Sequence, residues 1–173
     1  MSPKAWLTIA FFISSAMTVS FYLTPFFSPS GSFIDLDGTP GVMDHWDIWS
    51  GKDPFTMILY SIGDMVCHQQ MSRTLILNGS EMPICIRDLG LLAGFSLGSA
   101  ACIPMMERLH SRKILVIAIV LMSVTVFEWM AETASVDLPA ARLATAMVSG
   151  AGAALLLSWM LNRNMKRNEQ AFA

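Results

Sequence analysis

The sequence predicts an all-α polytopic membrane protein with four transmembrane helices and one short helix that is re-entrant or interfacial. Hydrophobic residues make up 54% of the 173 positions and charged residues 14%, whereas soluble domains carry about a quarter charged residues. Four apolar segments can each cross about 30 Å of hydrocarbon as a helix, at residues 5–27, 89–106, 114–131 and 143–161. Alternating patterns typical of a membrane barrel are absent from the sequence. We therefore expect a single membrane domain over residues 1–173.

The first apolar segment could also be a secretory signal peptide. Signal peptides have an apolar core of about 7–15 residues after a positively charged start. Residues 5–27 form a longer uncharged run, and Lys4 is the only charged side chain before it. We therefore predict that this segment is a helix retained in the protein.

The distribution of charge predicts the orientation in the membrane. Positive side chains follow the second and fourth apolar segments: Arg108, Arg112, Lys113, Arg163, Lys166 and Arg167. The connection at residues 28–88 is acidic and carries seven carboxylates against three positive side chains before Asp88. Because cytoplasmic loops carry an excess of Lys and Arg, we expect a multi-pass protein of the cell membrane. Both termini would be cytoplasmic and the connection extracytoplasmic.

This connection is long enough to hold structure of its own. After Pro- and Gly-rich turn sequences, the Trp pair at residues 46–49 is typical of a membrane interface. Asp53-Pro54 predicts the start of a helix over about residues 54–70, whose apolar part is too short to span a bilayer. Tyr60, Asp64 and Cys67 follow spacings of three or four, which predicts that they share one face.

Small residues predict where the helices approach each other closely. The second apolar segment carries Gly90, Gly94 and Gly98 at intervals of four, and the fourth carries Gly150 and Gly152. Small residues at such spacings let helix backbones come together in a membrane. We expect this packing to occur within the chain rather than against another protein.

Two polar clusters stand out in the apolar sequence. Cys67-His68-Gln69 is followed by Arg73, and Pro83-Ile84-Cys85 is followed by Arg87 and Asp88. Polar groups of this kind beside a bilayer are costly unless they pair, bind a ligand or react. These clusters therefore mark the candidate functional site.

Three interpretations of the clusters remain open. Cys67, His68, Cys85 and Asp88 could bind zinc, or copper with the help of Met65, Met71 and Met82. Alternatively, a Cys67–Cys85 disulfide could form outside the cytoplasm and contribute about 3 kcal/mol. Finally, the charges could form a polar network that neutralises Glu128 and locks the helix ends. That network would consist of Gln69, Arg73, Arg87, Glu128 and Arg142.

The clusters also resemble a known family. The residues that carry the resemblance are Cys67, His68, Gln69, Arg73, Gly79, Pro83, Cys85, Arg87, Asp88 and Gly90, followed by Arg142 and Thr145. This arrangement resembles the DUF2085 family of small uncharacterised integral membrane proteins, mainly of archaea and bacteria. Many members have a third cysteine where this chain has Asp88, which argues against an all-thiolate metal site and leaves a Cys/His/Asp site open. The resemblance implies a fold and a polar site, but no settled activity.

Two functions are consistent with these features. The chain shows no catalytic or nucleic-acid-binding motif, and an exposed loop with Trp46 and Trp49 would suit docking. The leading prediction is therefore a non-catalytic accessory or stabilising subunit of a larger archaeal membrane complex, in contact with other membrane subunits. The alternative is a membrane metal-binding or thiol-redox protein that uses Cys67, His68, Cys85 and Asp88.

Overall fold

The computed structural model describes residues 2–133 and 139–172, and only the backbone of 139–140 and 165–172. Its helices are α1 (Pro3–Leu23), α2 (Trp46–Trp49), α3 (Pro54–Val66), α4 (Ile86–Met105), α5 (Arg112–Thr133) and α6 (Pro139–Phe172). Short strands β1 (Ile76–Leu77) and β2 (Ser80–Glu81) form one antiparallel pair, and 3₁₀ turns follow α1 and α4 at Thr24–Phe27 and Met106–Arg108. The side chains of Lys166 and Arg167 lie outside the described residues.

Four helical segments in the described part of the chain are long and apolar enough to cross a membrane. They are Pro3–Phe27, Ile86–Arg108, Arg112–Thr133 and Ala141–Asn164. The prediction of an all-α polytopic membrane protein with four spans is thus confirmed. The chain predicted as one domain divides into two compact units. We call residues 1–16 and 90–173 the helical unit, and residues 17–89 the loop unit.

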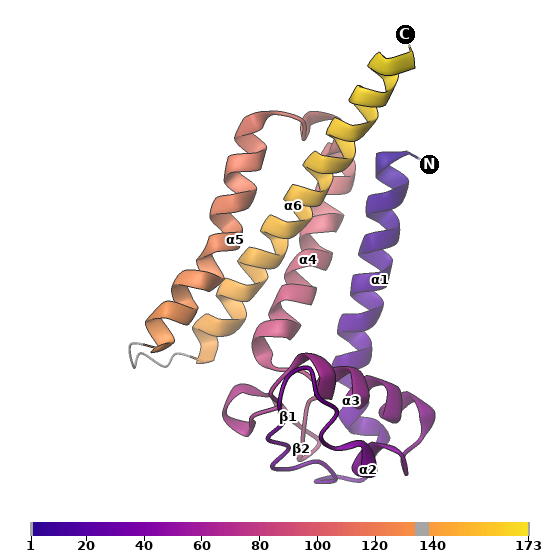
Figure 1. Cartoon of the computed structure of the whole chain (residues 1–173), viewed down its shortest axis with the longest axis vertical. Helices are drawn as coiled ribbons and strands as arrows, with labels where there is room; N and C mark the ends of the chain where they lie inside the picture. The colour runs from indigo at the N-terminus through magenta and orange to yellow at the C-terminus, as the bar shows by residue number, and fades with distance from the viewer. Residues whose placement is uncertain (1, 134–138, 173) are drawn as a thin grey trace. The chain divides into compact units, whose positions relative to one another are not determined.

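In the helical unit, α6 packs against both α4 and α5 (Figure 1). A Cβ atom on Gly94 would overlap the backbone of Met147, and one on Gly150 would overlap the Leu91 carbonyl. A Cβ on Gly152 would lie 2.9 Å from the Ala118 carbonyl oxygen of α5. The predicted close packing within the chain is confirmed, because glycine alone lets these backbones approach so closely.

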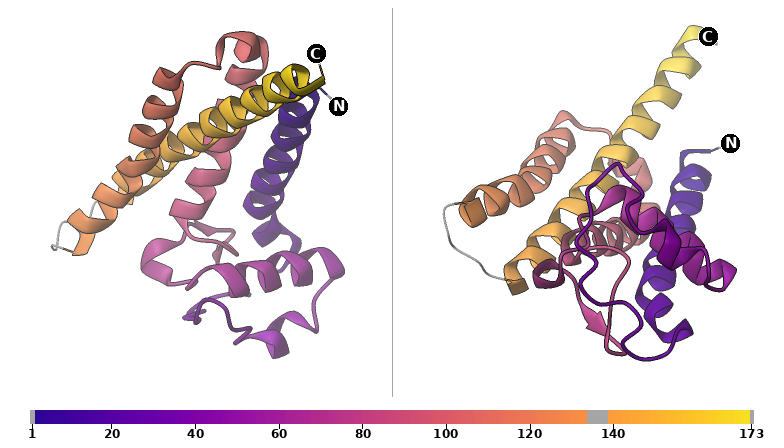
Figure 2. Two further views of the ribbon diagram at one scale, coloured as in Figure 1. Left: turned by 45° about the horizontal axis from the view of Figure 1, so that its top comes forward. Right: turned by 60° about the horizontal axis from the view of Figure 1, so that its bottom comes forward.

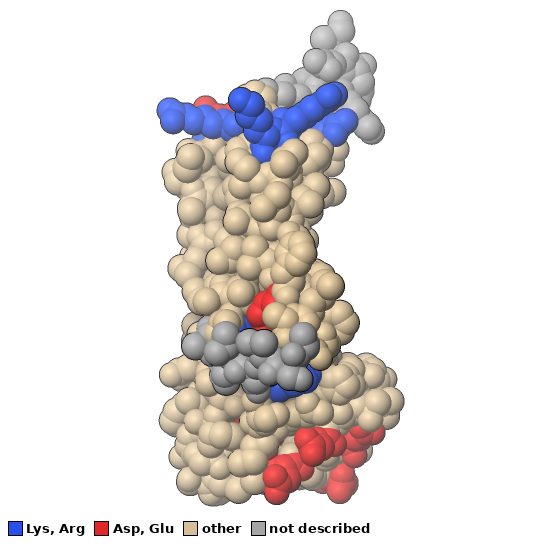
Figure 3. Space-filling model, turned by 90° about the vertical axis from the view of Figure 1, so that its left-hand side faces the viewer, with Lys and Arg blue, Asp and Glu red and all other residues tan. Residues whose placement is uncertain are grey.

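Basic side chains gather at one end of the helical unit (Figure 3). The exposed members are Lys4, Arg108, Arg112, Lys113 and Arg163. Lys4 forms an ion pair of 3.1 Å with Glu107 in this region. At the same end, an apolar cluster of Leu7, Cys102, Met106 and Leu109 fills the space between the helices. Cys102 is buried there as part of the packing.

The loop unit has an aromatic core. Phe33, Leu36, Trp49 and Tyr60 are buried together, with the Trp49 and Tyr60 rings stacked at 4.8 Å. The expectation that Trp49 is exposed is wrong, since its side chain is fully buried and its indole donates to Asp64 Oδ2 at 3.2 Å. Trp46 is half exposed. In Figure 2, α2 and the irregular segment before it lie beside α3.

The third helix begins where the sequence predicts but ends earlier. The Asp53 carboxylate accepts hydrogen bonds from the backbone N–H groups of Phe55 and Thr56, at 3.1 and 3.0 Å, as an N-cap does. The helix ends at Val66 rather than near residue 70, because Cys67 is extended, with φ −131° and ψ 151°. Its predicted continuation through Cys67 is therefore wrong.

A tight hairpin connects the two predicted clusters, and the sequence analysis does not predict it. Asn78 and Gly79 have φ values of 51° and 69°, which suits the type I′ turns of two-residue hairpins. Ile76 pairs with Glu81, and Leu77 pairs with Ser80. The Asn78 side chain also donates to the carbonyls of Pro25 and Ser28 at 3.0 and 3.1 Å. The hairpin turns the chain back toward α3.

The approach of α3 to the segment after the hairpin depends on Gly63. A Cβ atom at this position would overlap the carbonyl group of Pro83. The overlapping atoms of Pro83 belong to the backbone and cannot rotate away as a side chain could. A side chain at residue 63 would therefore fit only if α3 and the segment at Pro83 moved apart. Gly63 thereby sets the distance between the residues that follow it and those that follow Pro83.

We predict that Gly63→Ala destabilises the protein by about 1–3 kcal/mol through this overlap. Helix propensity alone predicts the opposite sign, since Gly-to-Ala in a helix interior stabilises by about 0.5–1 kcal/mol. Thermal unfolding of the purified protein in detergent measures the effect. Gly51→Ala is the control, because a Cβ there meets no atom within 4 Å. A Gly63→Ala variant that melts at or above the wild-type temperature would contradict the prediction.

Candidate functional site

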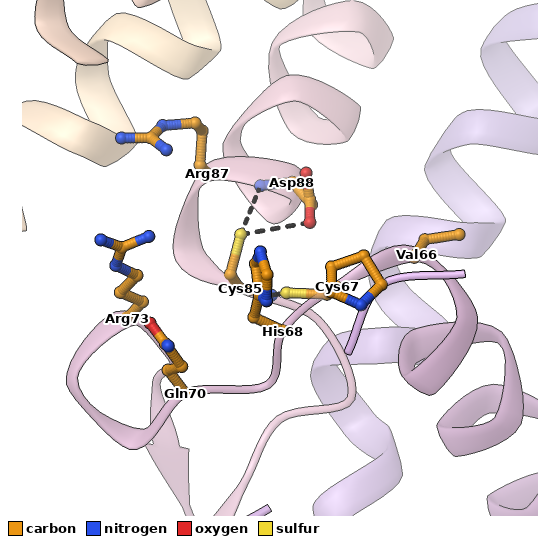
Figure 4. A pocket seen from close by; sticks show the side chains of 9 residues that line it. Val66, Cys67, His68, Gln70, Arg73, Cys85, Arg87 and Asp88 are labelled. Carbon is orange, nitrogen blue, oxygen red and sulfur yellow. Dashed lines mark hydrogen bonds between the residues drawn. The ribbon is translucent and has the colours of Figure 1, made fainter. Parts of the chain in front are cut away.

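The two predicted polar clusters meet in the loop unit. The side-chain ligand atoms of Cys67, Cys85 and Asp88 all lie within 4.8 Å of one another. Figure 4 shows these side chains from close by. Cys67 directly follows α3, while Cys85 directly precedes α4. The site is therefore built where one helix ends and another begins.

A buried glutamine joins the two halves of the site. Gln69 is fully buried, and its side-chain Nε2 donates to the carbonyl oxygen of Pro83 at 3.0 Å. Its own backbone has a φ of 48°, in the left-handed region that non-glycine residues rarely adopt. This turn directs the chain away from α3 after Cys67. The Gln69 side chain then links that turn to the residues before Cys85.

The start of α4 organises Cys85 and Asp88. The Cys85 thiol donates to Asp88 Oδ2 at 3.1 Å, and the Cys85 sulfur accepts from the Asp88 backbone N–H at 3.5 Å. The second bond is an N-cap interaction, in which the side chain of the residue before a helix accepts from the backbone N–H of its third residue. The backbone N–H of Cys85 donates to the Cys67 sulfur instead of to Asp88. The positive end of the helix dipole also favours negative charge at this point.

The two thiols differ in acidity. Cys67 is buried, and its sulfur accepts a hydrogen bond from the Cys85 backbone N–H at 3.2 Å. Its hydrogen bond with the Cys85 side chain lowers the pKa of Cys67, against the opposing effect of burial. For Cys85, that same side-chain hydrogen bond, burial and the Asp88 charge raise the pKa. Cys67 is therefore the thiol that gives up its proton first.

A cavity of about 260 Å³ opens beside these groups. Its lining comes entirely from the loop unit: Pro40, Val66, Cys67, His68, Gln70, Arg73, Cys85, Arg87 and Asp88. Six of these residues belong to the two clusters singled out in the sequence. In the view of Figure 4, the guanidinium groups of Arg73 and Arg87 lie on one side of the Cys85 sulfur, with Cys67 and Asp88 on the other.

His68 lines this cavity but does not belong to the group of three converging ligand atoms. Its side chain is exposed, and Nδ1 lies 3.3 Å from the carbonyl oxygen of Gly38. A carbonyl can only accept, so Nδ1 carries the proton in this contact. In the neutral imidazole, Nε2 is then the nitrogen with a free lone pair. Of the four residues predicted as metal ligands, the structure brings three together and places His68 beside the same cavity. Metal binding by these residues stays a prediction.

The residues predicted as one polar network are found in both units. Gln69, Arg73 and Arg87 belong to the loop unit, while Glu128 and Arg142 belong to the helical unit. Arg142 is buried and forms an ion pair of 2.9 Å with Glu132, a residue outside the predicted network. Glu132 lies one helical turn after Glu128 on α5, which is the signal that could have identified it. Neutralisation of Glu128 by Arg87 or Arg142 stays a prediction.

Sequence reasoning missed a buried carboxylate close to the site. Asp64 is fully buried on α3 and accepts from the backbone N–H of His45 at 3.0 Å. His45 Nδ1 and Trp49 Nε1 also contact this carboxylate, at 3.0 and 3.2 Å. Its position four residues after Tyr60 on the buried face was the available signal. Asp64 therefore fixes the segment before α3 rather than contributing to an exposed acidic surface.

Glu81 is a second buried carboxylate. Its Oε1 accepts from the Asp35 backbone N–H at 2.7 Å, and burial raises the pKa of this side chain. The Tyr60 hydroxyl donates to the Glu81 carbonyl oxygen at 2.6 Å. By contrast, the side chains of five other acidic residues are exposed: Asp35, Asp37, Asp44, Asp47 and Asp53. Figure 3 shows acidic side chains gathered in one region of the molecular surface.

Comparison with known proteins identifies a family. A model described as a predicted membrane protein, DUF2085, matches residues 67–156, which is more than half of the chain. The match begins at Cys67 and includes both clusters of the site. No curated protein and no solved structure matches the chain.

Cys67 and Cys85 are free thiols in this structure, so the disulfide stays a prediction. Their proximity predicts that the mild oxidant diamide links them, with two thiols oxidised and one diamide reduced. After denaturation and iodoacetamide treatment, mass spectrometry should then find alkylation at Cys102 alone. Cys85→Ser should leave Cys67 and Cys102 both alkylated. Alkylation of all three cysteines after diamide treatment of the wild type would contradict the observed proximity.

Proposed function

The chain belongs to the DUF2085 family of predicted membrane proteins, and we propose that it is a membrane metal-binding protein with a zinc site. Cys67, Cys85 and Asp88 would be the protein ligands. The observation that supports this most directly is the convergence of their ligand atoms within 4.8 Å at the wall of a cavity. Zinc accepts thiolate and carboxylate ligands and commonly takes three from the protein when a fourth position is open.

The geometry requires little rearrangement to hold zinc. Zinc–sulfur bonds are about 2.3 Å, so two sulfurs on a tetrahedral ion lie about 3.8 Å apart. Ligand atoms already within 4.8 Å of one another reach such positions by movements of about 1 Å. Binding displaces the thiol protons, and the lower pKa of Cys67 makes this sulfur the easier one to ionise.

The composition of the site favours zinc over copper. Copper(I) prefers thiolate and thioether sulfur, whereas carboxylate oxygen suits harder ions. Asp88 contributes an oxygen, and no methionine is among the described residues that line the cavity. Met82 is fully buried, while Met65 and Met71 are about half exposed. The methionines that suggested copper in the sequence are thus not part of the cavity wall.

The accessory-subunit role is the weaker proposal. It relied on a loop that exposes both Trp46 and Trp49 for docking, but Trp49 belongs to the buried aromatic core. Of the pair, Trp46 remains half exposed. Association with other membrane subunits therefore stays a prediction, and metal binding has the more specific structural support.

We also infer that the site faces away from the cytoplasm. The helix α4 begins immediately after Cys85 and ends beside the turn that carries Arg108. Its 20 residues rise about 30 Å, which is the thickness of the hydrocarbon layer. The basic end of the helical unit (Figure 3) favours the cytoplasm by the positive-inside rule. Cys85 and Asp88, at the other end of α4, would then be extracytoplasmic, as would residues 28–88.

We predict that the purified protein binds one zinc ion per chain. Cys67→Ser and Cys85→Ser should each weaken zinc binding by about 100-fold or more, because loss of a direct ligand exceeds the effect, about 10- to 100-fold, of losing a residue that only supports a ligand. Asp88→Asn should weaken binding by about 10- to 100-fold, because asparagine keeps a side-chain oxygen but loses the negative charge. Elemental analysis after dialysis gives the stoichiometry, and competition with a chelating dye gives the affinity.

Cys102→Ser is the matched control for these variants, because Cys102 is buried in the apolar cluster of the helical unit. It should bind zinc as the wild type does. Absence of bound zinc in reduced wild-type protein, or equal affinity in the Cys67→Ser and Cys102→Ser variants, would rule out the proposed site.

A separate prediction concerns orientation. In a cysteine-free background, Ser50→Cys in the loop unit should react with a membrane-impermeant maleimide in intact cells. Ser111→Cys, in the turn before α5, should react only after permeabilisation. Both serines are exposed, so accessibility to the reagent and not burial decides the result. The reverse labelling pattern would invert the inferred topology.

A further inference from the structure

We propose that the zinc site binds a small oxyanion, a carboxylate or a phosphate group, at the fourth coordination position of the metal. Arg73 and Arg87 would hold the same anion from the opposite side of the cavity. This inference rests on the proposed zinc site and specifies its ligand. The observation that carries it is the presence of three metal-ligand side chains and two guanidinium groups around one cavity.

The charges of the cavity favour an anion. Two thiolates and one carboxylate on a zinc ion leave one net negative charge. The guanidinium groups of Arg73 and Arg87 line the same cavity and place positive charge beside the metal position. The positive end of the α4 dipole adds to the attraction.

The chemistry and size of the cavity specify the type of anion. Arginine presents a planar fork of donors that matches the two oxygens of a carboxylate or phosphate. Three protein ligands leave one tetrahedral position of zinc open to an external oxygen. The cavity has a volume of about 260 Å³, compared with about 30 Å³ for a water molecule in the liquid. It can thus hold a small oxyanion together with several waters.

Cobalt(II) provides the test, because its visible absorption reports changes of ligand in a zinc site. The cobalt-loaded protein in detergent would be titrated with acetate and, separately, with inorganic phosphate at constant ionic strength. We expect a saturable spectral change with at least one of these anions. The anion that acts at the lower concentration distinguishes a carboxylate ligand from a phosphate ligand.

The arginine variants test the second half of the inference. Arg73→Gln and Arg87→Gln should each raise the half-saturating anion concentration about tenfold or more, since each removes charged hydrogen bonds to the anion. Arg73→Lys and Arg87→Lys keep the charge without the fork and should give intermediate values. Arg112→Gln is the control, because Arg112 is exposed at the start of α5 in the helical unit. Retained cobalt stoichiometry shows that a variant is folded at the site.

The possible failures are distinguishable. Wild-type protein that binds no cobalt overturns the metal proposal and the anion inference together. Cobalt binding with a spectrum that neither anion changes overturns the anion inference alone. The same holds if the Arg73→Gln and Arg87→Gln variants respond to the anions as the wild type does.

Discussion

The candidate site depends on one close backbone approach, between Gly63 of α3 and the carbonyl group of Pro83. Any Cβ at residue 63 would overlap that carbonyl. The same carbonyl oxygen accepts a hydrogen bond from the buried Gln69 side chain at 3.0 Å. Steric fit and hydrogen bonding therefore fix the same peptide group from two sides. Since Cys67 lies four residues after Gly63 and Cys85 two residues after Pro83, this contact determines how near the two sulfurs come.

The site also shows how a loop beside a membrane can hold several ionisable groups. The buried carboxylate of Asp64 is compensated by three hydrogen-bonding groups from His45 and Trp49. Asp88 is placed at a helix start, where the helix dipole offsets its charge. These carboxylates thus serve different purposes: Asp64 anchors the segment that precedes α3, whereas Asp88 faces the cavity with Cys85.

Hydropathy was sufficient to predict the four spans, because each apolar segment must satisfy its own backbone in a bilayer as a helix. The glycine spacings likewise predicted where α6 meets its neighbours. The end of α3 at Val66 was not predictable in the same way, since Cys67 is already extended. Two residues later, Gln69 adopts a left-handed conformation that its residue type does not favour. The two clusters were recognised from composition, but their convergence required the Asn78-Gly79 hairpin. Trp49 was misplaced because an aromatic residue in an acidic loop resembles an interfacial anchor until its partner, Asp64, is known.

The family match includes the residues of the candidate site but not all of the residues that hold them in place. The matched residues begin at Cys67, so they include Cys67, Cys85 and Asp88. The aromatic core and Asp64 lie before that point, yet Tyr60 holds the Glu81 carbonyl at 2.6 Å and Gly63 meets Pro83. The segment before Cys67 therefore contributes the surface on which the matched residues converge. It follows that a family resemblance limited to the cysteine clusters identifies the reactive groups, while the preceding residues of this chain determine the distance between them.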